Sequence, residues 1–127
     1  MTIHRRTGIA LTLFLLAIAG VADAHHGTEA YDMGKQITLK GTIAQFEWSN
    51  PHGQVHLDVT DDKGNVVHYN FETQPPSILT HAGWNHNSIK PGDQVSVTFH
   101  PVKNGAPVGI IMSITLPNGD VLTPNEK

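Results

Sequence analysis

The sequence predicts a small all-β domain, a barrel of five to six strands with one short helix between the third and fourth strands. Three observations support this fold class. Apolar residues alternate with polar ones in several short runs, which is the period of a half-buried strand. Turn residues, mostly glycine, asparagine, aspartate and proline, separate these runs. Helical spacing occurs in a single short segment of the chain that follows the first 24 residues.

Residues 1–24 are predicted to be a signal peptide for general secretion. His4-Arg5-Arg6 gives a positive n-region, Ile9 to Ala19 is almost entirely apolar, and Ala22-Asp23-Ala24 matches an A-x-A cleavage site. The apolar run is shorter than the roughly 20 residues that a membrane-spanning helix needs. We therefore expect cleavage after Ala24, no stable membrane anchor afterwards, and a periplasmic or secreted protein that begins at His25.

A polar arm, residues 25–35, is predicted to precede the barrel domain, residues 36–127. The arm shows no strand alternation, and Tyr31-Asp32 is expected to pin it to the barrel. In the first strand the apolar parity of Ile37 to Ile43 is reversed at Phe46 and Trp48. This reversal predicts a bulged, bent strand, and Gly41 would permit the bend.

The second and third strands are predicted to form a hairpin across Asp62-Lys63-Gly64. The residues expected to point inward are Val55, Leu57 and Val59 in the second strand and Val67, Tyr69 and Phe71 in the third.

If Asp61 pairs with Asn65 at this turn, the register places Asp58 opposite His68 and His56 opposite Asn70. His56 and His68 then become diagonal neighbours on the outer face of the sheet.

Pro75-Pro76 is predicted to open a short helix over Ser77 to Trp84, with Gly83 placed to end it. Two further alternating strands and a last hairpin follow. Their apolar positions are Val95, Val97 and Phe99, then Val108, Ile110, Met112, Ile114 and Leu116, and finally Val121-Leu122 beyond the turn Pro117-Asn118-Gly119. Three strands, a helix and then two or more strands is the order of the OB-fold, a Greek-key barrel.

The composition restricts the chemistry of the mature chain. Six lysines and no arginine stand against ten carboxylates, and such an acidic surface disfavours nucleic acid as a partner. Cysteine is absent, so a metal would have to bind nitrogen and oxygen ligands. Histidine supplies the nitrogen, with eight residues in the mature chain.

Six segments spread over nearly the whole mature chain form a specific set. They are His25-His26 to Tyr31-Asp32, Leu39-Lys40-Gly41-Thr42, Glu47-Trp48-Ser49-Asn50-Pro51-His52, Gly83-Trp84, Ile89-Lys90-Pro91-Gly92-Asp93 and Ser113 to Gly119. Together they resemble DUF6152, an uncharacterised family of exported bacterial proteins, and Gly27 departs from the serine expected there. The resemblance implies a small single-domain periplasmic protein and brings no established activity.

His25 is the first candidate metal ligand. After cleavage its α-amino group and imidazole could close a chelate on one ion, and one more imidazole would complete a centre that resembles the copper brace of periplasmic copper-binding proteins and copper monooxygenases. Nitrogen ligands in tetragonal geometry favour Cu(II). The expected helpers are His26 and His52, which begins the second strand after Asn50-Pro51.

His56 and His68 are the remaining candidate ligands. His52 and His56 lie about 13 Å apart by strand rise, too far to chelate one ion together. His56 could instead join His68 across the hairpin, with Asp58 as a direct or supporting ligand. The competing interpretation is that exposed strand histidines are common and that a histidine after a signal peptide only keeps the cleavage site accessible.

Enzymatic motifs are absent from the sequence: there is no nucleophile elbow, no phosphate-binding glycine loop and no H-E-x-x-H. A copper oxidase or monooxygenase is a minority interpretation, because a barrel this small offers little surface for a large substrate. The main prediction is an exported protein that binds a transition metal. The alternative is an OB-type module that binds a peptide, glycan or small molecule without metal. The sequence identifies no protein partner.

Overall fold

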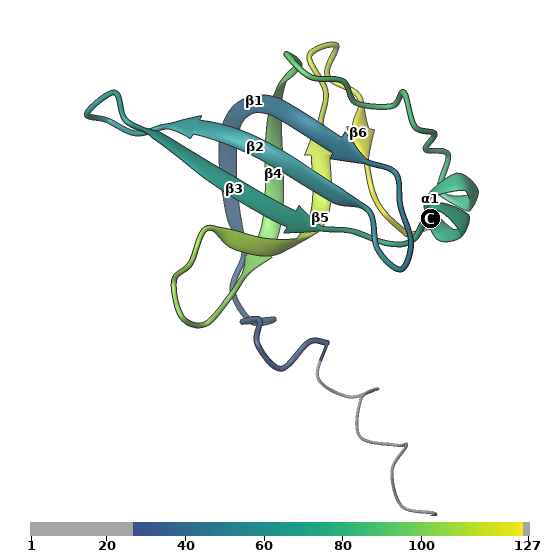
Figure 1. Ribbon diagram of the computed structural model, residues 1–127, viewed down its shortest axis with the longest axis horizontal. Coiled ribbons are helices and arrows are strands. Elements are labelled where there is room, and N and C mark those ends of the chain that lie inside the picture. Colours follow the sequence, from purple (N-terminus) through teal and green to yellow (C-terminus); the bar gives the residue numbers. More distant parts are fainter. Residues whose placement is uncertain (1–26, 126–127) are drawn as a thin grey trace, which may run out of the picture.

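The alternating segments of the sequence form six strands, and one short helix follows the third. The computed structural model describes residues 27–125. In chain order the elements are β1 (Ile37–Glu47), β2 (Gln54–Thr60), β3 (Val66–Glu72), α1 (Pro76–His81), β4 (Gln94–Pro101), β5 (Val108–Thr115) and β6 (Val121–Leu122) (Figure 1). The predicted signal peptide, together with His25 and His26, lies outside the described residues.

The strands pair in the order β3-β2-β1-β4-β5-β6, with every neighbouring pair antiparallel. A short parallel pairing between β3 and β5, from Asn70↔Val108 to Glu72↔Ile110, closes the first five strands into a barrel. The short strand β6 extends β5 outside the closed barrel. This arrangement confirms the predicted all-β, OB-like barrel with its helix between the third and fourth strands.

The strand β1 takes part in both halves of the barrel because it bends. Its first half, from Ile37 to Thr42, pairs with β4, and its second half, from Thr42 to Glu47, pairs with β2. A register shift between Ile43 and Gln45 marks the predicted bulge. Gly41 lies where β1 packs closely against β2, since a Cβ atom there would stand 2.5 Å from the carbonyl oxygen of Asp58.

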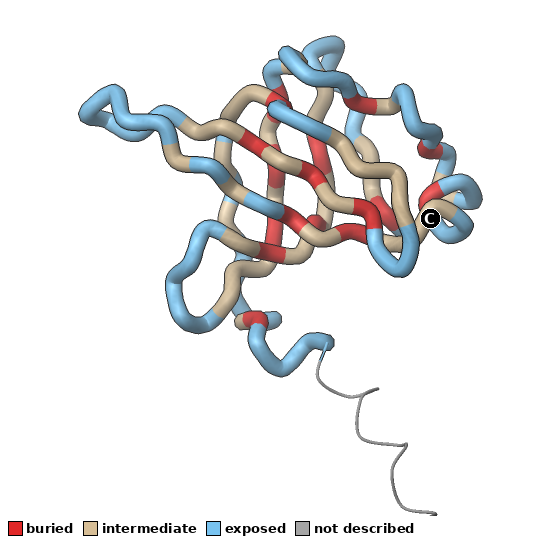
Figure 2. The backbone as a smooth tube through the Cα atoms, viewed as in Figure 1, coloured by how far each residue is buried: buried red, intermediate tan, exposed pale blue. Residues whose placement is uncertain are grey.

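The buried residues lie along the barrel strands and near α1 (Figure 2). Its fully buried side chains come from all of the long strands and from the segment around α1, namely Ile43, Val55, Leu57, Phe71, Leu79, Trp84, Ile89, Val97, Phe99 and Ile114. The rings of Phe71 and Phe99 pack with centroids 4.6 Å apart. Trp84 follows α1 and donates its indole N–H to the carbonyl oxygen of Thr123 at 2.8 Å, so its one polar atom is satisfied.

The helix α1 ends at His81, before the predicted end at Trp84, and Gly83 adopts φ +89° just beyond it. The backbone N–H of Trp84 donates to the carbonyl of Leu79, which joins this turn to the helix. The predicted turn glycines Gly64 and Gly119 also have positive φ angles. A left-handed backbone at these positions is available to glycine without steric cost.

The predicted alternation through β5 is wrong at Ile110 and Met112. The buried residues are Ile111 and Ile114, whereas Ile110 and Met112 are only half-buried. The cause is a second bulge: Phe99 pairs with Ile111 but Thr98 pairs with Ser113, so Met112 is an extra residue in the ladder. A single extra residue in a strand exchanges the core-facing and outward-facing positions for all residues beyond it.

Gly41→Ala tests the close approach of β1 and β2. The new methyl group would also lie 2.8 Å from Cγ of Leu57, so backbone and core must both shift. We expect the free energy of unfolding to fall by about 1–3 kcal/mol, the usual range for overpacking, as measured by urea denaturation. The control is Gly34→Ala, whose methyl group would meet its nearest neighbour at 3.5 Å. Equal effects of the two substitutions would contradict this account of β1.

Candidate functional site

Three rows of polar side chains cross the outer face of β1, β2 and β3. They face outward because the intervening positions, such as Val55, Leu57 and Phe71, fill the core. Imidazoles, carboxylates and amides predominate, and the rows contain no lysine or arginine. From the β1–β2 loop outward, the rows are Glu47, Gln54 and Glu72, then Gln45, His56 and Asn70, then Thr42, Asp58 and His68.

His56 lies in the middle row and contacts a carboxylate of the neighbouring strand. Its Nε2 is 2.8 Å from Oε1 of Glu47. The side-chain amide of Gln45 donates to the same oxygen at 3.3 Å, which helps to hold the carboxylate in place. The ring nitrogen Nδ1 of His56 takes no part in this pair.

His68 forms a similar pair across the hairpin. Its Nδ1 is 2.6 Å from Oδ1 of Asp58, which stands directly opposite in the register. The His68 side chain is 79% exposed, so solvent screens this contact strongly. The predicted register is confirmed, and it makes His56 and His68 diagonal neighbours.

The turn between β2 and β3 fixes that register. The backbone N–H of Asp61 donates to the carbonyl of Asn65 at 2.8 Å, as predicted. The Asp61 carboxylate accepts the side-chain N–H of Asn65 and the backbone N–H groups of Asn65 and Lys63. These bonds, led by those from Asn65, hold the pKa of Asp61 below its usual value.

His52 was predicted to begin the second strand, but β2 starts only at Gln54. His52 instead belongs to the β1–β2 loop, residues 48–53, which includes a cis peptide bond between Asn50 and Pro51. The neighbouring Gly53 joins the loop to the end of β3: its N–H donates to Gln74 and its carbonyl accepts from Thr73. This attachment brings Nδ1 of His52 to 3.4 Å from Oε1 of Glu72.

Tyr31 anchors the arm to the start of the β4–β5 loop, as predicted for Tyr31-Asp32. Tyr31 forms an isolated bridge with Val102, and the N–H of Asp32 donates to the carbonyl of Pro101 at 2.8 Å. The phenol is buried and donates to Oε2 of Glu72 at 3.4 Å. Burial, followed by the charge and hydrogen bond of Glu72, raises the pKa of Tyr31 above its usual value.

One carboxylate therefore serves two partners. Oε1 of Glu72 faces His52 in the β1–β2 loop, and Oε2 faces Tyr31 in the arm. We refer to Tyr31, Glu72 and His52 as the Glu72 junction. The Glu72 junction links three segments that are far apart in the sequence: the arm, the β1–β2 loop and the end of β3.

Residues 27–125 contain no group of three histidine or acidic side chains arranged to hold a metal ion. Each of the three outer histidines instead meets one carboxylate through one ring nitrogen, Nδ1 in His52 and His68 and Nε2 in His56. The other ring nitrogen of each histidine is the one that could bind a ligand. A metal centre at any of these histidines would need further donors.

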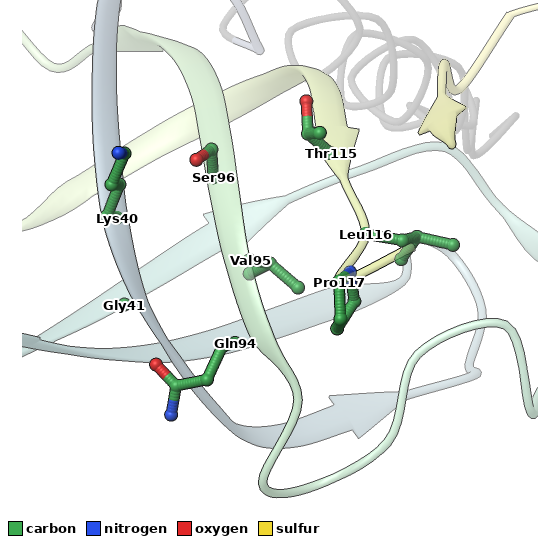
Figure 3. A pocket seen from close by; sticks show the side chains of 8 residues that line it. All are labelled: Lys40, Gly41, Gln94, Val95, Ser96, Thr115, Leu116 and Pro117. Carbon is green, nitrogen blue, oxygen red and sulfur yellow. The ribbon is translucent and has the colours of Figure 1, made fainter. Parts of the chain in front are cut away.

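A shallow groove crosses β1, β4 and the end of β5 (Figure 3). Its lining includes no histidine or acidic residue. The residues that form it are Lys40, Gly41, Gln94, Val95, Ser96, Thr115, Leu116 and Pro117. The chemistry of this groove suits hydrogen bonding through hydroxyl, amide and ammonium groups rather than metal binding.

Sequence reasoning singled out the histidines but missed the carboxylates Glu47 and Glu72 that they contact. The available signal was their parity, because both occupy outward positions on the strands that flank β2. The contact between His52 and Glu72 also depends on the loop bonds of Gly53, which alternation does not encode.

The fold and these pairs define a small OB-like barrel protein with a polar, histidine-bearing outer face. None of the helices within residues 27–125 is long and apolar enough to cross a membrane. The chain belongs to DUF6152, a family of unknown function, whose family model matches residues 12–112. No curated protein matches the chain.

Tyr31→Phe tests the buried phenol. Because the pKa of Tyr31 is raised on folding, its contribution to stability is present below about pH 10 and is lost as the pH rises above that value. We expect the free energy of unfolding of the wild type to fall more steeply above pH 10 than that of Tyr31→Phe. Chemical denaturation at several alkaline pH values measures both slopes. Parallel slopes would contradict the assigned environment of the phenol.

Proposed function

We propose that this protein is exported, is cleaved after Ala24, and binds Cu(II) through the amino group and imidazole of His25 with help from His26 and His52. The observation that carries this proposal is the Glu72 junction, because it ties the arm that follows these residues to the loop that holds His52.

Chain length is compatible with such a centre. His25 precedes the anchored Tyr31 by six positions, which corresponds to a reach of at most about 20 Å. The Tyr31 hydroxyl and the His52 ring contact the two oxygens of the Glu72 carboxylate, so the arm and the His52 loop meet at this one side chain. A reach of this length would allow the amino terminus of the cleaved chain to meet the His52 ring.

The ligand chemistry favours copper. An amine and two or three imidazoles form a nitrogen-rich set, and Cu(II) binds such sets most tightly among the first-row divalent ions. Glu72 faces Nδ1 of His52, which leaves Nε2 as the donor to the ion. The amine becomes a ligand only when the signal peptide has been removed.

The proposed centre uses His52 rather than His56 or His68, because His52 alone among these three shares a carboxylate with the arm. The contacts of His56 and His68 are to Glu47 and Asp58, and neither of these pairs includes an arm residue.

The first test combines intact mass with copper titration of the protein exported by its own signal. We expect a mature start at His25 and one nitrogen-rich site by electron paramagnetic resonance. His25→Ala and His52→Ala should each weaken Cu(II) binding more than about tenfold, since even supporting residues of metal sites have effects of that size. His68→Ala is the control, because its exposed ring contacts Asp58 and not the arm. A different start, or binding indifferent to His25→Ala, would overturn the proposal.

Copper binding should also weaken as the pH falls. Protons compete with the metal for the amine and imidazole nitrogens, so affinity is expected to fall progressively towards about pH 5. Isothermal titration at a series of pH values measures this dependence. Affinity that is the same at pH 5 and pH 8 would contradict ligation by histidine.

A second candidate function is a metal-independent OB-type binding module. The outer β2–β3 face and the loops β1–β2 and β4–β5 bind ligands in many OB-folds. Here the Glu72 junction lies between those two loops, so a peptide or glycan would bind beside the docked arm. Such binding should survive replacement of His25 and His52 by alanine, which distinguishes it from the copper proposal.

A further inference from the structure

Two asparagine–glycine pairs occupy exposed turns of the barrel. Asn104-Gly105 lies in the β4–β5 loop, and Asn118-Gly119 lies in the turn between β5 and β6. A glycine after asparagine leaves its peptide nitrogen open to the asparagine side chain, because no Cβ atom stands beside it. We infer that Asn104 is a site of spontaneous covalent modification, that its conversion to isoaspartate loosens the docked arm, and that the fold protects Asn118. This inference does not depend on copper binding.

The reaction needs only base and water. Loss of the proton from the backbone N–H of Gly105 lets this nitrogen attack Cγ of the Asn104 side chain. An N–Cγ bond forms, the bond from Cγ to the side-chain nitrogen breaks, and ammonia leaves with a proton taken from water. Water then opens the cyclic succinimide at either of its carbonyls. Opening at Cγ gives aspartate, and opening at the main-chain carbonyl gives isoaspartate, in which the chain runs through the side-chain carbons.

The hydrogen bonds of the two glycines distinguish the sites. The N–H of Gly119 donates to the carbonyl of Leu116 at 2.9 Å, whereas the N–H of Gly105 donates to the carbonyl of Val102 at 3.4 Å. The longer bond is the weaker one, because 3.4 Å lies beyond the usual range of an N–H···O bond. The attacking nitrogen is therefore more readily available at Gly105 than at Gly119.

The two asparagine side chains differ in the same sense. In both turns the side-chain oxygen accepts a backbone N–H from two residues further on, Ala106 in one turn and Asp120 in the other. The amide nitrogen of Asn118 also donates to Oδ2 of Asp120 at 2.9 Å. Among residues 27–125 the amide nitrogen of Asn104 has no such acceptor. The Asn118 side chain must therefore break two bonds to rotate, and the Asn104 side chain must break one.

Asn104 stands directly after the residues that hold the arm. Tyr31 forms the bridge with Val102, and the N–H of Lys103 donates to the carbonyl of Ala30 at 2.9 Å. Val102 also accepts the bond that closes the turn around Asn104. Isoaspartate places an additional main-chain carbon inside this turn, so the turn no longer closes with the same geometry. The contacts of Val102 and Lys103 with the arm are expected to weaken as a result.

The first experiment follows both asparagines in one sample of the purified protein. Incubation in a mildly alkaline buffer, followed by peptide mass spectrometry, measures the two rates of conversion. In the folded protein we expect Asn104 to convert at least about fivefold faster than Asn118, the factor that corresponds to one ordinary hydrogen bond. In urea, where the turns are lost, the two rates should become nearly equal.

The second experiment separates the extended backbone from the added charge. Ion exchange isolates the converted protein, and its isoaspartate is identified by fragmentation in the mass spectrometer. Asn104→Asp supplies the same charge on an ordinary backbone. Hydrogen exchange of residues 27–35 should be at least about fivefold faster in the isoaspartate form than in the wild type, the effect of losing one hydrogen bond. Asn104→Asp should exchange like the wild type, because its side-chain oxygen can still accept from Ala106.

The outcomes test the two parts of the inference separately. Conversion of Asn118 as fast as that of Asn104 in the folded protein would overturn the assignment of the site, as would a folded protein in which neither converts. A difference in rate that persists unchanged in urea would overturn the protection by the fold. An arm that exchanges equally in the wild type and the isoaspartate form would overturn the link to arm docking. These measurements use no Cu(II), so each of these results leaves the proposed function standing.

Discussion

The bend in β1 is the constraint on which the rest of the structure depends. One strand pairs with β4 along its first half and with β2 along its second half, and the bulge near Ala44 lets it change direction between them. Without that change the six strands would form an open sheet with unpaired edges. With it, β3 returns to β5, and the parallel pairing of Asn70 to Glu72 closes the barrel.

Closure also determines where the polar groups meet. Because Glu72 is the last residue of β3, the closing pairing holds it beside the start of β5 and the β4–β5 loop that anchors Tyr31. The bonds of Gly53 to the segment after β3 bring His52 to its other side. The Glu72 junction is thus a product of barrel topology, although its members come from three distant parts of the chain.

Much of the fold could be predicted from the sequence because it depends on parity and turn chemistry. The reversal at Phe46 predicted the bulge of β1, and Asp61 with Asn65 predicted the register of the hairpin. The bulge opposite Phe99 escaped prediction, because Ile110, Ile111 and Met112 are all apolar and fit either parity. The extra residue of β5 is revealed only by its pairing with β4.

The candidate site was less predictable for a related reason. Histidines attract notice in a sequence, whereas a carboxylate on an outward strand position resembles any solvated surface residue. Whether Glu72 contacts His52 depends on loop conformation as well as on strand register, and the bonds that set the loop are made by backbone atoms. The anchoring of the arm by Tyr31 was predictable, but its use of Glu72 was not.

The charge of the three polar rows has a kinetic consequence. Glu47, Glu72 and Asp58 lie on one face of the barrel with no lysine or arginine in the rows between them. Such a face carries a negative potential that concentrates cations and repels anions, including polyanions, before any specific contact forms. Encounter with a divalent ion is therefore faster in dilute buffer than in concentrated salt, where the screening length falls from roughly 10 Å at 0.1 M to about 3 Å at 1 M. The same face that orients the imidazoles also governs how quickly an ion arrives.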